Sequence, residues 1–279
     1  MSEDINLGVQ QILDESKKAI ANKKKININK NLTEEDKPLL ESTTLWDYPK
    51  QSYGKTPKGN NKYPGVTPAF IIYNMVIRYT KPGELVVDPM CGSGTTIDVC
   101  KGEGRRVMGF DIVPTRSDII QNDARKLPLE DNSVDMIFID SPYGDNIKYN
   151  DHPANFGNFS AEDENFYIEL EKVMKECYRV LKPGKEIGWL IGDQWVKKKF
   201  TPVGFKIYNQ LSKYFETVDI VCVARRNQSS NTGVWHYRAI KWKFYLRGFK
   251  YLFIMKKSTP VSAQEPKTHE KVTWNHYKR

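Results

Sequence analysis

The chain of 279 residues carries 43 Lys or Arg against 34 Asp or Glu, which gives a formal net charge of +9. This length suits one well-filled α/β domain with short appendages, and the basic balance favours a polyanionic partner. The four cysteines include no CxxC pair and no nearby histidine at ligand spacing, so we expect reduced thiols and no metal. The polar N-terminus and the lack of a long apolar run predict a cytoplasmic protein without membrane contact.

Composition divides the chain into three parts. Residues 1–43 are polar and lysine-rich, and we expect a basic arm that is either solvated or in touch with a nucleic-acid backbone. Strand and helix patterns alternate through residues 44–256, which indicates one domain, and residues 257–279 form a polar tail. The domain opens with a Pro- and Gly-rich stretch whose aromatic residues predict packing over another element: Trp46, Tyr48, Tyr53 and Tyr63.

The first long helix is expected at Ala69–Tyr79. Thr67-Pro68 supplies an N-cap and a proline for the first helical position, and Lys81-Pro82-Gly83 ends the pattern. Three short apolar strands are expected after it, each closed by an aspartate: Leu85–Val87 by Asp88, Val107–Phe110 by Asp111 and Val134–Ile139 by Asp140. Between the first two strands, the glycine-rich turn Cys91–Thr96 leads into a helix that ends near Gly102.

The second half of the chain continues this alternation. Helices are expected at Phe166–Val180 and Val203–Phe215, and strands at Glu186–Ile191, Val218–Ala224 and Phe249–Met255. Two polar loops, 150–165 and 225–243, interrupt the pattern and are expected to flank a ligand crevice. The whole predicts a Rossmann-like α/β fold, a mostly parallel twisted sheet with helices on both faces and its crevice at the carboxyl ends of the strands.

The glycine turn and the acids after it indicate a ligand with a carboxylate, a ribose and a base. Gly92 and Gly94 let the backbone approach a ligand, and the helix start that follows, with the Thr95 hydroxyl, suits a carboxylate. No lysine precedes Thr95, so the phosphate-binding GxxxxGK[ST] turn is excluded, and the GxGxxG spacing is missing too. Asp111 stands where an acid commonly binds ribose hydroxyls, and Asp123-Ala124 follows it. S-adenosylmethionine is such a ligand.

Three motifs resemble those of the nucleic-acid amino-methyltransferases. Asp88-Pro89-Met90-Cys91-Gly92-Ser93-Gly94-Thr95 resembles their cofactor motif, and Asp140-Ser141-Pro142-Tyr143 resembles their catalytic tetrapeptide, [D/N/S]-P-P-[Y/F/W]. Thr67-Pro68 with Phe70 resembles the motif that closes over the methionine end of the cofactor. Their order is that of one permuted class of the family, and the resemblance spans about Trp46 to Lys256.

The resemblance implies transfer of a methyl group from S-adenosylmethionine to an exocyclic amine of a DNA base. The implied cofactor residues are Thr67, Pro68, Phe70, Asp88, Pro89, Cys91, Gly92, Gly94, Thr95, Asp111, Ile112, Asp123 and Ala124. The implied catalytic residues are Asp140, Ser141, Pro142 and Tyr143. The amine lone pair is delocalised into the ring, so a carboxylate and a backbone carbonyl would accept its hydrogens while the tyrosine stacks on the flipped base. No covalent role is expected for Cys91.

Ser141 departs from the family pattern and leaves the target base open. Aligned as D-S-P-Y, the tetrapeptide has an adenine-type acid in its first place, which narrowly favours adenine N6. Aligned with Ser141 first, it is nearer the cytosine N4 type. The chain has little room for a separate recognition domain, so an RNA or tRNA base methyltransferase and a non-catalytic subunit of a larger complex stay as alternatives. A homodimer or a specificity partner is also left open.

Basic and aromatic residues of the second polar loop are the expected nucleic-acid contacts, although a solvated face explains them equally well: Arg225, Arg226, Trp235, Arg238 and Lys241. Two further segments, Gly144–Asn146 and Asp193–Trp195, fit a pocket wall and ordinary packing equally well.

Overall fold

The computed structural model describes residues 37–145, 147, 149–196, 198–226 and 233–259. The chain divides after Lys37 into two units, and the fold belongs to the second. The predicted basic arm lies almost wholly outside the described residues, as do Asn146, part of the second polar loop and most of the predicted C-terminal tail.

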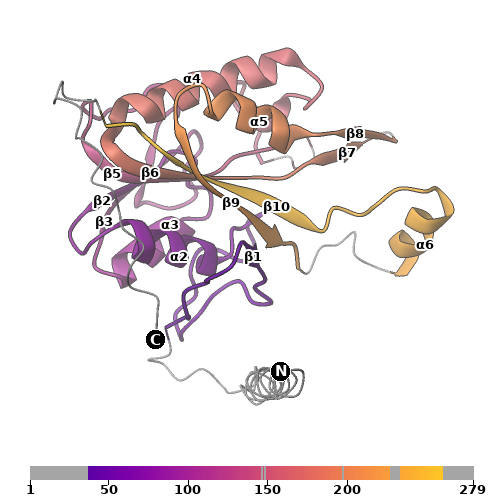
Figure 1. The fold of residues 1–279 in the computed structure, drawn as a ribbon, viewed down its shortest axis with the longest axis horizontal. Coiled ribbons are helices and arrows are strands. Elements are labelled where there is room, and N and C mark those ends of the chain that lie inside the picture. The colour runs from indigo at the N-terminus through magenta and orange to yellow at the C-terminus, as the bar shows by residue number, and fades with distance from the viewer. Residues whose placement is uncertain (1–36, 146, 148, 197, 227–232, 260–279) are drawn as a thin grey trace, which may run out of the picture. The chain divides into compact units, whose positions relative to one another are not determined.

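An eight-stranded sheet forms the centre of the fold, in the order β1-β9-β10-β6-β5-β2-β3-β4 (Figure 1). Its strands are β1 Leu45–Trp46, β2 Leu85–Asp88, β3 Arg106–Asp111, β4 Ile119–Gln121, β5 Val134–Asp140, β6 Leu181–Ile191, β9 Glu216–Ala224 and β10 Phe249–Lys256. All neighbours run parallel except β10, which is antiparallel to both β6 and β9. The predicted mostly parallel sheet is confirmed, and β10 brings its first residues to the carboxyl edge of the parallel strands.

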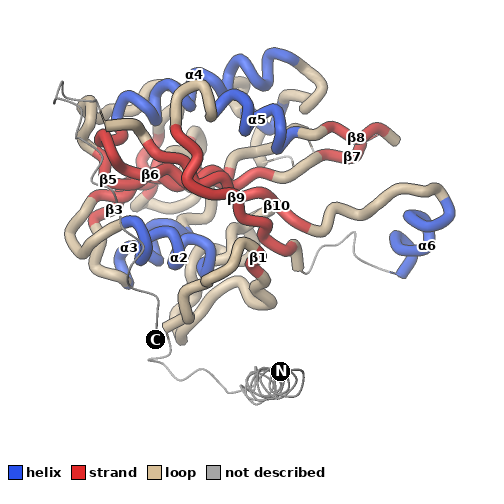
Figure 2. Tube along the Cα trace, in the orientation of Figure 1, coloured by secondary structure: helices blue, strands red, loops and turns tan. Residues whose placement is uncertain are grey.

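Helices cover both faces of this sheet, as predicted (Figure 2). α2 Ala69–Tyr79 and α3 Thr95–Gly102 lie on one face, and α4 Glu164–Val180 and α5 Val203–Leu211 lie on the other. Successive strand residues point to opposite faces and so build two cores. Val86 and Met136 join the core with α2 and α3, whereas Val87 and Ile137 join the core with α4 and α5.

The second polar loop differs most from its prediction. It contains a nine-residue helix, α6 Gly233–Lys241, in which Ala239 is the one buried residue. A helix this short carries a weak sequence pattern, and α6 has no stripe of buried side chains to mark it. A hairpin of β7 Gln194–Val196 and β8 Lys199–Thr201 was also not predicted, and α5 ends at Leu211, before the predicted Phe215.

Candidate functional site

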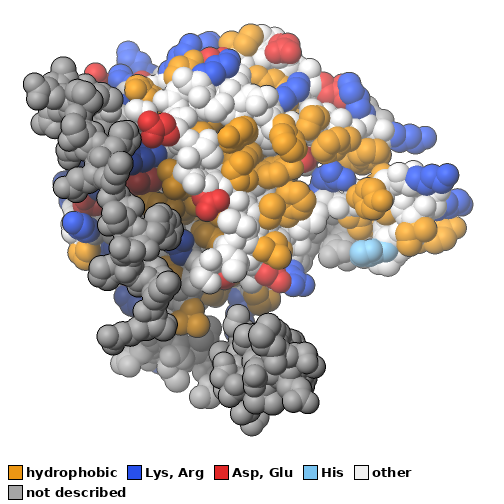
Figure 3. Space-filling model, in the orientation of Figure 1, with side chains coloured by type: hydrophobic (Ala, Val, Ile, Leu, Met, Phe, Trp, Pro, Cys, Tyr) orange, Lys and Arg blue, Asp and Glu red, His pale blue; other side chains and the backbone are white. Residues whose placement is uncertain are grey.

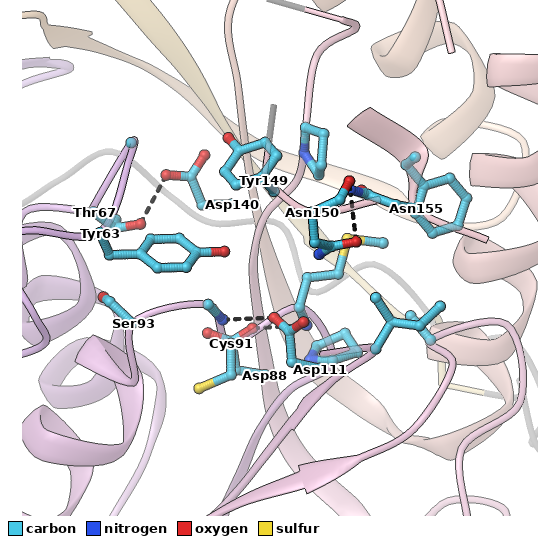
Figure 4. Close-up of a pocket in the computed structure, with 18 of the residues that line it drawn as sticks. Tyr63, Thr67, Asp88, Cys91, Ser93, Asp111, Asp140, Tyr149, Asn150 and Asn155 are labelled. Carbon is cyan, nitrogen blue, oxygen red and sulfur yellow. Dashed lines mark hydrogen bonds between the residues drawn. The ribbon is translucent and has the colours of Figure 1, made fainter. Parts of the chain in front are cut away.

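A cavity lies at the carboxyl ends of β2, β3 and β5, where the three predicted aspartates meet (Figure 4). The glycine turn forms one wall, and residues 63–67 and 149–156 contribute others. Most of the predicted cofactor residues line it: Thr67, Asp88, Pro89, Cys91, Gly92, Thr95, Asp111, Ile112, Asp123 and Ala124. The sheet topology thus brings together side chains that the strand-end rule predicted to meet.

The turn between β2 and α3 has no room for side chains at its glycines. Gly92 and Gly94 have left-handed φ angles of +51° and +81°. A Cβ on Gly94 would lie 2.6 Å from Nη1 of Arg116, and one on Gly92 would lie 3.0 Å from the Tyr63 ring. Asp98 holds the Arg116 guanidinium through two hydrogen bonds of 2.8 Å, so the contact at Gly94 is a fixed one.

Asp88 anchors the turn from inside. It is 4% exposed and accepts hydrogen bonds from the Thr96 hydroxyl and, at 3.1 Å, from the Met90 N–H. Burial raises the pKa of this carboxyl to about 7, against the lowering effect of those two donors. Asp88 therefore fixes the backbone of the turn more than it offers charge to a ligand.

Asp111 closes β3 at the cavity wall. Its Oδ2 accepts the Gly92 N–H at 2.9 Å and its Oδ1 accepts the Val113 N–H at 3.0 Å, while burial raises its pKa. Each oxygen keeps a second lone pair, so the carboxylate can still accept ribose hydroxyls. This acid, the cradle at Gly92 and the N-terminus of α3 are complementary to a ribose and a carboxylate, so the residues present fit S-adenosylmethionine.

The aromatic stretch before α2 packs over other elements, as predicted. Trp46, Tyr48 and Tyr53 are buried, and the Gly59 N–H donates to Asp98 at 2.7 Å. Further along this stretch, the ring of Tyr63 lies 6.0 Å, centroid to centroid, from that of Tyr149. No motif in the sequence marks either ring as a site residue, because only the tertiary contact brings them to the cavity.

Asp140 is held by two donors at the end of β5. The Thr67 hydroxyl donates to its Oδ2 at 2.7 Å (Figure 4). The Lys250 ammonium donates to Oδ1 at 2.8 Å and to Oδ2 at 2.9 Å. Lys250 stands 110 positions further along the chain, on β10, and no motif in the sequence marks it. It is the principal residue that the sequence analysis missed.

The tetrapeptide residues face different surroundings. Asp140 and Pro142 line the first cavity, and Tyr143 lines a second one. Ser141 is 1% exposed, lines neither cavity, and accepts a 3.0 Å hydrogen bond from the indole N–H of Trp189. Its side chain is therefore fixed in the core, and the predicted role of the Ser141-Pro142 backbone carbonyl stays a prediction.

The second cavity adjoins the first and shares residues with it: Tyr63, Gly65, Val66 and Tyr149. Two of the predicted nucleic-acid residues line it beside Tyr143. Arg225 Nη2 donates to the Tyr143 hydroxyl at 3.1 Å, and its guanidinium carbon lies 5.8 Å from the centre of that ring. Arg226 forms an ion pair with the exposed Asp47, with one hydrogen bond of 2.7 Å.

The other predicted nucleic-acid residues, Trp235, Arg238 and Lys241, lie on α6, away from both cavities. Figure 3 shows Lys, Arg and hydrophobic side chains together where α6 stands in Figure 1. The Arg238 guanidinium lies 4.9 Å from the Trp235 ring centre and 5.8 Å from that of Trp242, and the Lys241 ammonium lies 5.6 Å from that of Tyr237. The structure thus splits the predicted set into two groups.

Some predicted residues lie outside the first cavity. Pro68 lines the second cavity, and Gly94 is the N-cap of α3 and lines neither one. Phe70 stacks on Tyr48, with ring centroids 5.0 Å apart, and lines neither cavity. Phe70 belongs to the aromatic cluster under the 44–66 stretch, and its contact with the cofactor stays a prediction.

The segment Asp193–Trp195 serves packing. Asp193 accepts the Gly204 N–H at 2.9 Å at the start of α5, and Trp195 stacks on Phe244 with ring centroids 5.4 Å apart. The Gln194 amide donates to Asp145 at 3.0 Å, and none of these residues lines either cavity.

Within the described ranges, no three His, Cys, Asp or Glu side chains are grouped so that they could hold a metal ion. None of the helices in that part of the chain combines the length and apolar character that crossing a membrane requires.

The fold and the first cavity define a class of protein. A doubly wound sheet, a glycine turn before a helix and an acid closing the next strand make a Rossmann-like protein with a nucleotide-type ligand site at its strand ends. Within this class, the chain belongs to the DNA methylase family of N6 and N4 methyltransferases, whose profile matches residues 9–122 and 134–278. The family predicted from the three motifs is confirmed.

Curated relatives match over short stretches. The type II methyltransferase M2.DpnII of Streptococcus pneumoniae is 39% identical over 57 residues, which is 20% of this chain and 21% of the relative. The type II methyltransferase M.Cfr9I of Citrobacter freundii is 39% identical over 67 residues, 24% of this chain and 21% of the relative. The DNA adenine methyltransferase YhdJ of Escherichia coli is 30% identical over 83 residues, 30% of this chain and 26% of the relative. The matched stretch therefore spans about a fifth to a quarter of these relatives.

Proposed function

We propose that this protein is a DNA methyltransferase that moves a methyl group from S-adenosylmethionine to an exocyclic amine of a base. One observation carries the proposal: Asp140 lies where the two cavities meet. On one side are the glycine turn and Asp111; on the other are Tyr143 and Arg225. Membership of the DNA methylase family supports the same assignment.

The first cavity is the proposed cofactor site. Asp111 would accept ribose hydroxyls, and the turn at Gly92 with the start of α3 would receive the amino-acid carboxylate. Bound there, S-adenosylmethionine supplies a methyl group on a positively charged sulfur. Tyr63 and Tyr149 lie over the same cavity and would limit the access of water to it.

The second cavity is the proposed place of the target base. Asp140 and a backbone carbonyl of Ser141-Pro142 would accept the two amine hydrogens, which turns the nitrogen lone pair towards the methyl group. Pro142 restricts the backbone, so that the carbonyl needs little reorganisation. Tyr143 would stack on a base rotated out of its helix. Rate enhancement would then come from positioning and charge, with no covalent intermediate.

Adenine N6 is the favoured target, ahead of cytosine N4. The Asp140 carboxylate faces the cavity, whereas the Ser141 hydroxyl is turned towards Trp189. This supports the alignment with the acid in the first place of the tetrapeptide. One relative, YhdJ, is a DNA adenine methyltransferase.

Contact with the DNA backbone is assigned to two groups of residues. Arg225 and Arg226 lie beside the second cavity, and the exposed α6 carries Arg238 and Lys241 next to aromatic rings. Basic side chains of this kind bind phosphates, and aromatic rings stack on or wedge between bases.

The test is a methylation assay with a choice of substrates. The protein is incubated with labelled S-adenosylmethionine and with duplex DNA, single-stranded RNA or tRNA, and the methylated nucleoside is identified by mass spectrometry. We expect N6-methyladenine in DNA. Methylguanine in tRNA alone would contradict the proposal, and cofactor binding without any product would favour a non-catalytic subunit.

A further inference from the structure

The Lys250 ammonium stands beside Asp140 at the boundary between the two cavities. Asp140 lines the first cavity and Lys250 lines the second. The strand register explains their meeting. Asp140 pairs with Leu190 of β6, and Leu190 pairs with Leu252 of β10. Lys250, two residues before Leu252 on the same face, therefore projects at the carboxyl edge of the sheet.

Asp140 and Lys250 form a partly buried ion pair in which the ammonium keeps a donor hydrogen that Asp140 does not use. The side chains of Asp140 and Lys250 are 11% and 17% exposed, so water screens the pair less than it screens a surface one. Among the described residues, Lys250 hydrogen-bonds to Asp140 alone. An ammonium has three donor hydrogens, so at least one is left for another acceptor.

That remaining donor lies next to the proposed place of the base. The Lys250 ammonium is 5.5 Å from the ring centre of Tyr143, the residue proposed to stack on the base. A base whose amine faces Asp140 therefore brings the neighbouring atom of its Watson–Crick edge towards Lys250. That atom is an acceptor in two bases, N1 of adenine and N3 of cytosine. In guanine, the atom of that edge beside the amine is the donor N1–H.

We infer that Lys250 positions the target base, an inference that rests on the proposed function. It holds the Asp140 carboxylate in place and donates a hydrogen bond to the ring nitrogen beside the target amine. The ammonium thus favours a flipped adenine or cytosine and disfavours guanine, because two facing donors leave a buried polar group unsatisfied.

The test compares reaction rates on duplex DNA that contains the target sequence. That sequence is first mapped by methylation-sensitive sequencing of DNA treated with the protein and S-adenosylmethionine. Single-turnover rates are measured with the natural base and with its deaza analogue, 1-deazaadenine or 3-deazacytosine, in which the ring nitrogen is replaced by C–H. Wild type, Lys250→Met and Lys250→Arg are compared. Lys256→Met, at the other end of β10, is the matched control.

We expect the wild type and Lys256→Met to be about 10- to 100-fold slower on the analogue, the range for a hydrogen bond to a charged group. Lys250→Met should lose at least that factor on the natural duplex, because Asp140 also loses its charged partner, and should lose little more on the analogue. Lys250→Arg, which keeps a charged donor, should still discriminate against the analogue. Binding of S-adenosylhomocysteine by calorimetry should be unchanged in all three variants. The thermal midpoint should fall in Lys250→Met, because the partly buried Asp140 carboxylate loses its charged partner, and should stay unchanged in Lys250→Arg and Lys256→Met.

If the loss from Lys250→Met and the loss from the analogue multiply when the two changes are combined, the inference is overturned and the proposed function stays intact. A wild type that methylates both duplexes equally fast would have the same consequence. A wild type that methylates no DNA would overturn the proposed function, and the inference with it. If Lys250→Met does not fold, Lys250→Arg decides: equal rates on the two duplexes would overturn the inference.

Discussion

The two cavities are built in different ways. One wall of the first is formed by β2, its glycine turn and β3, which follow one another in the chain, and Asp88 and Asp111 in this wall accept hydrogen bonds from nearby backbone N–H groups. The second depends on partners that are distant in sequence: Arg225 is 82 positions from Tyr143, and Lys250 is 110 positions from Asp140. Backbone contacts hold this wall of the first cavity, whereas side chains that are distant in sequence contact one another beside the second.

The largest effect is expected at Asp140, where a substitution should lower the rate of methyl transfer and leave cofactor binding unchanged. Asp140→Ala removes the proposed acceptor of the amine hydrogens and should lower the methyl-transfer rate by about 10³-fold or more. Affinity for S-adenosylmethionine should change little, because the variant leaves the turn and Asp111 intact. Single-turnover kinetics and calorimetry measure the two quantities. Asp219→Ala, an exposed acid on β9, is the control, and a large loss of cofactor affinity in Asp140→Ala would contradict the prediction.

The acid under the turn should make stability depend on pH. The pKa of Asp88 is raised from 3.8 to about 7, so the folded state binds this proton more tightly than the unfolded state does. Its contribution to stability is present below about pH 4 and is lost as the pH rises to 7. At about 1.4 kcal/mol per pH unit, the loss between pH 5 and pH 8 is about 3 kcal/mol.

Asp88→Asn removes that titration while keeping an acceptor for the Thr96 hydroxyl. Urea unfolding of the ligand-free protein should therefore show the wild type losing stability relative to Asp88→Asn between pH 5 and pH 8. Parallel stability curves for the two proteins would show that the Asp88 proton is not coupled to folding.

A substitution at Asp111 tests the first cavity without changing a residue of the second. Asp111→Ala should weaken S-adenosylmethionine binding by about 10- to 100-fold, the loss expected for hydrogen bonds to a charged acceptor. At saturating cofactor the methyl-transfer rate should stay within a few-fold of the wild type, since Asp140 is untouched. Calorimetry and rates at several cofactor concentrations distinguish the outcomes, and an unchanged affinity would remove Asp111 from the cofactor site.

The smallest effect is expected on α6. Replacing Arg238 and Lys241 by alanine should weaken DNA binding several-fold and reduce the slope of log affinity against log salt by about 2, one for each phosphate contact. Cofactor affinity should not change. The matched control replaces two exposed lysines of α4, Lys172 and Lys175, with alanine. A salt slope equal to that of the wild type would show that Arg238 and Lys241 do not contact phosphates. Arg225 and Arg226 would then be the remaining proposed DNA contacts.

Short-range patterns predicted most of the fold. Helix α2 formed at the predicted residues, and each of the three acid-tipped strands formed as expected. The predicted cap was wrong: Pro68 itself is the N-cap, and the Thr67 hydroxyl donates to Asp140 instead of to the helix. Parallel strands align their carboxyl ends, so Asp88, Asp111 and Asp140 met at one cavity. Helix α6 was missed because its nine residues bury a single side chain, and burial is what makes a helix visible in a sequence.

The class of ligand could be predicted from local sequence, because the glycine turn and the acids that close β2 and β3 lie within one continuous stretch. The surroundings of the tetrapeptide depend on tertiary contacts and could not be predicted in this way. Trp189 turns the Ser141 hydroxyl into the core, and the antiparallel β10 carries Lys250 to Asp140. Contacts between neighbouring strands depend on the register in which the strands pair. Where the paired segments are distant in the chain, no local sequence motif indicates that register.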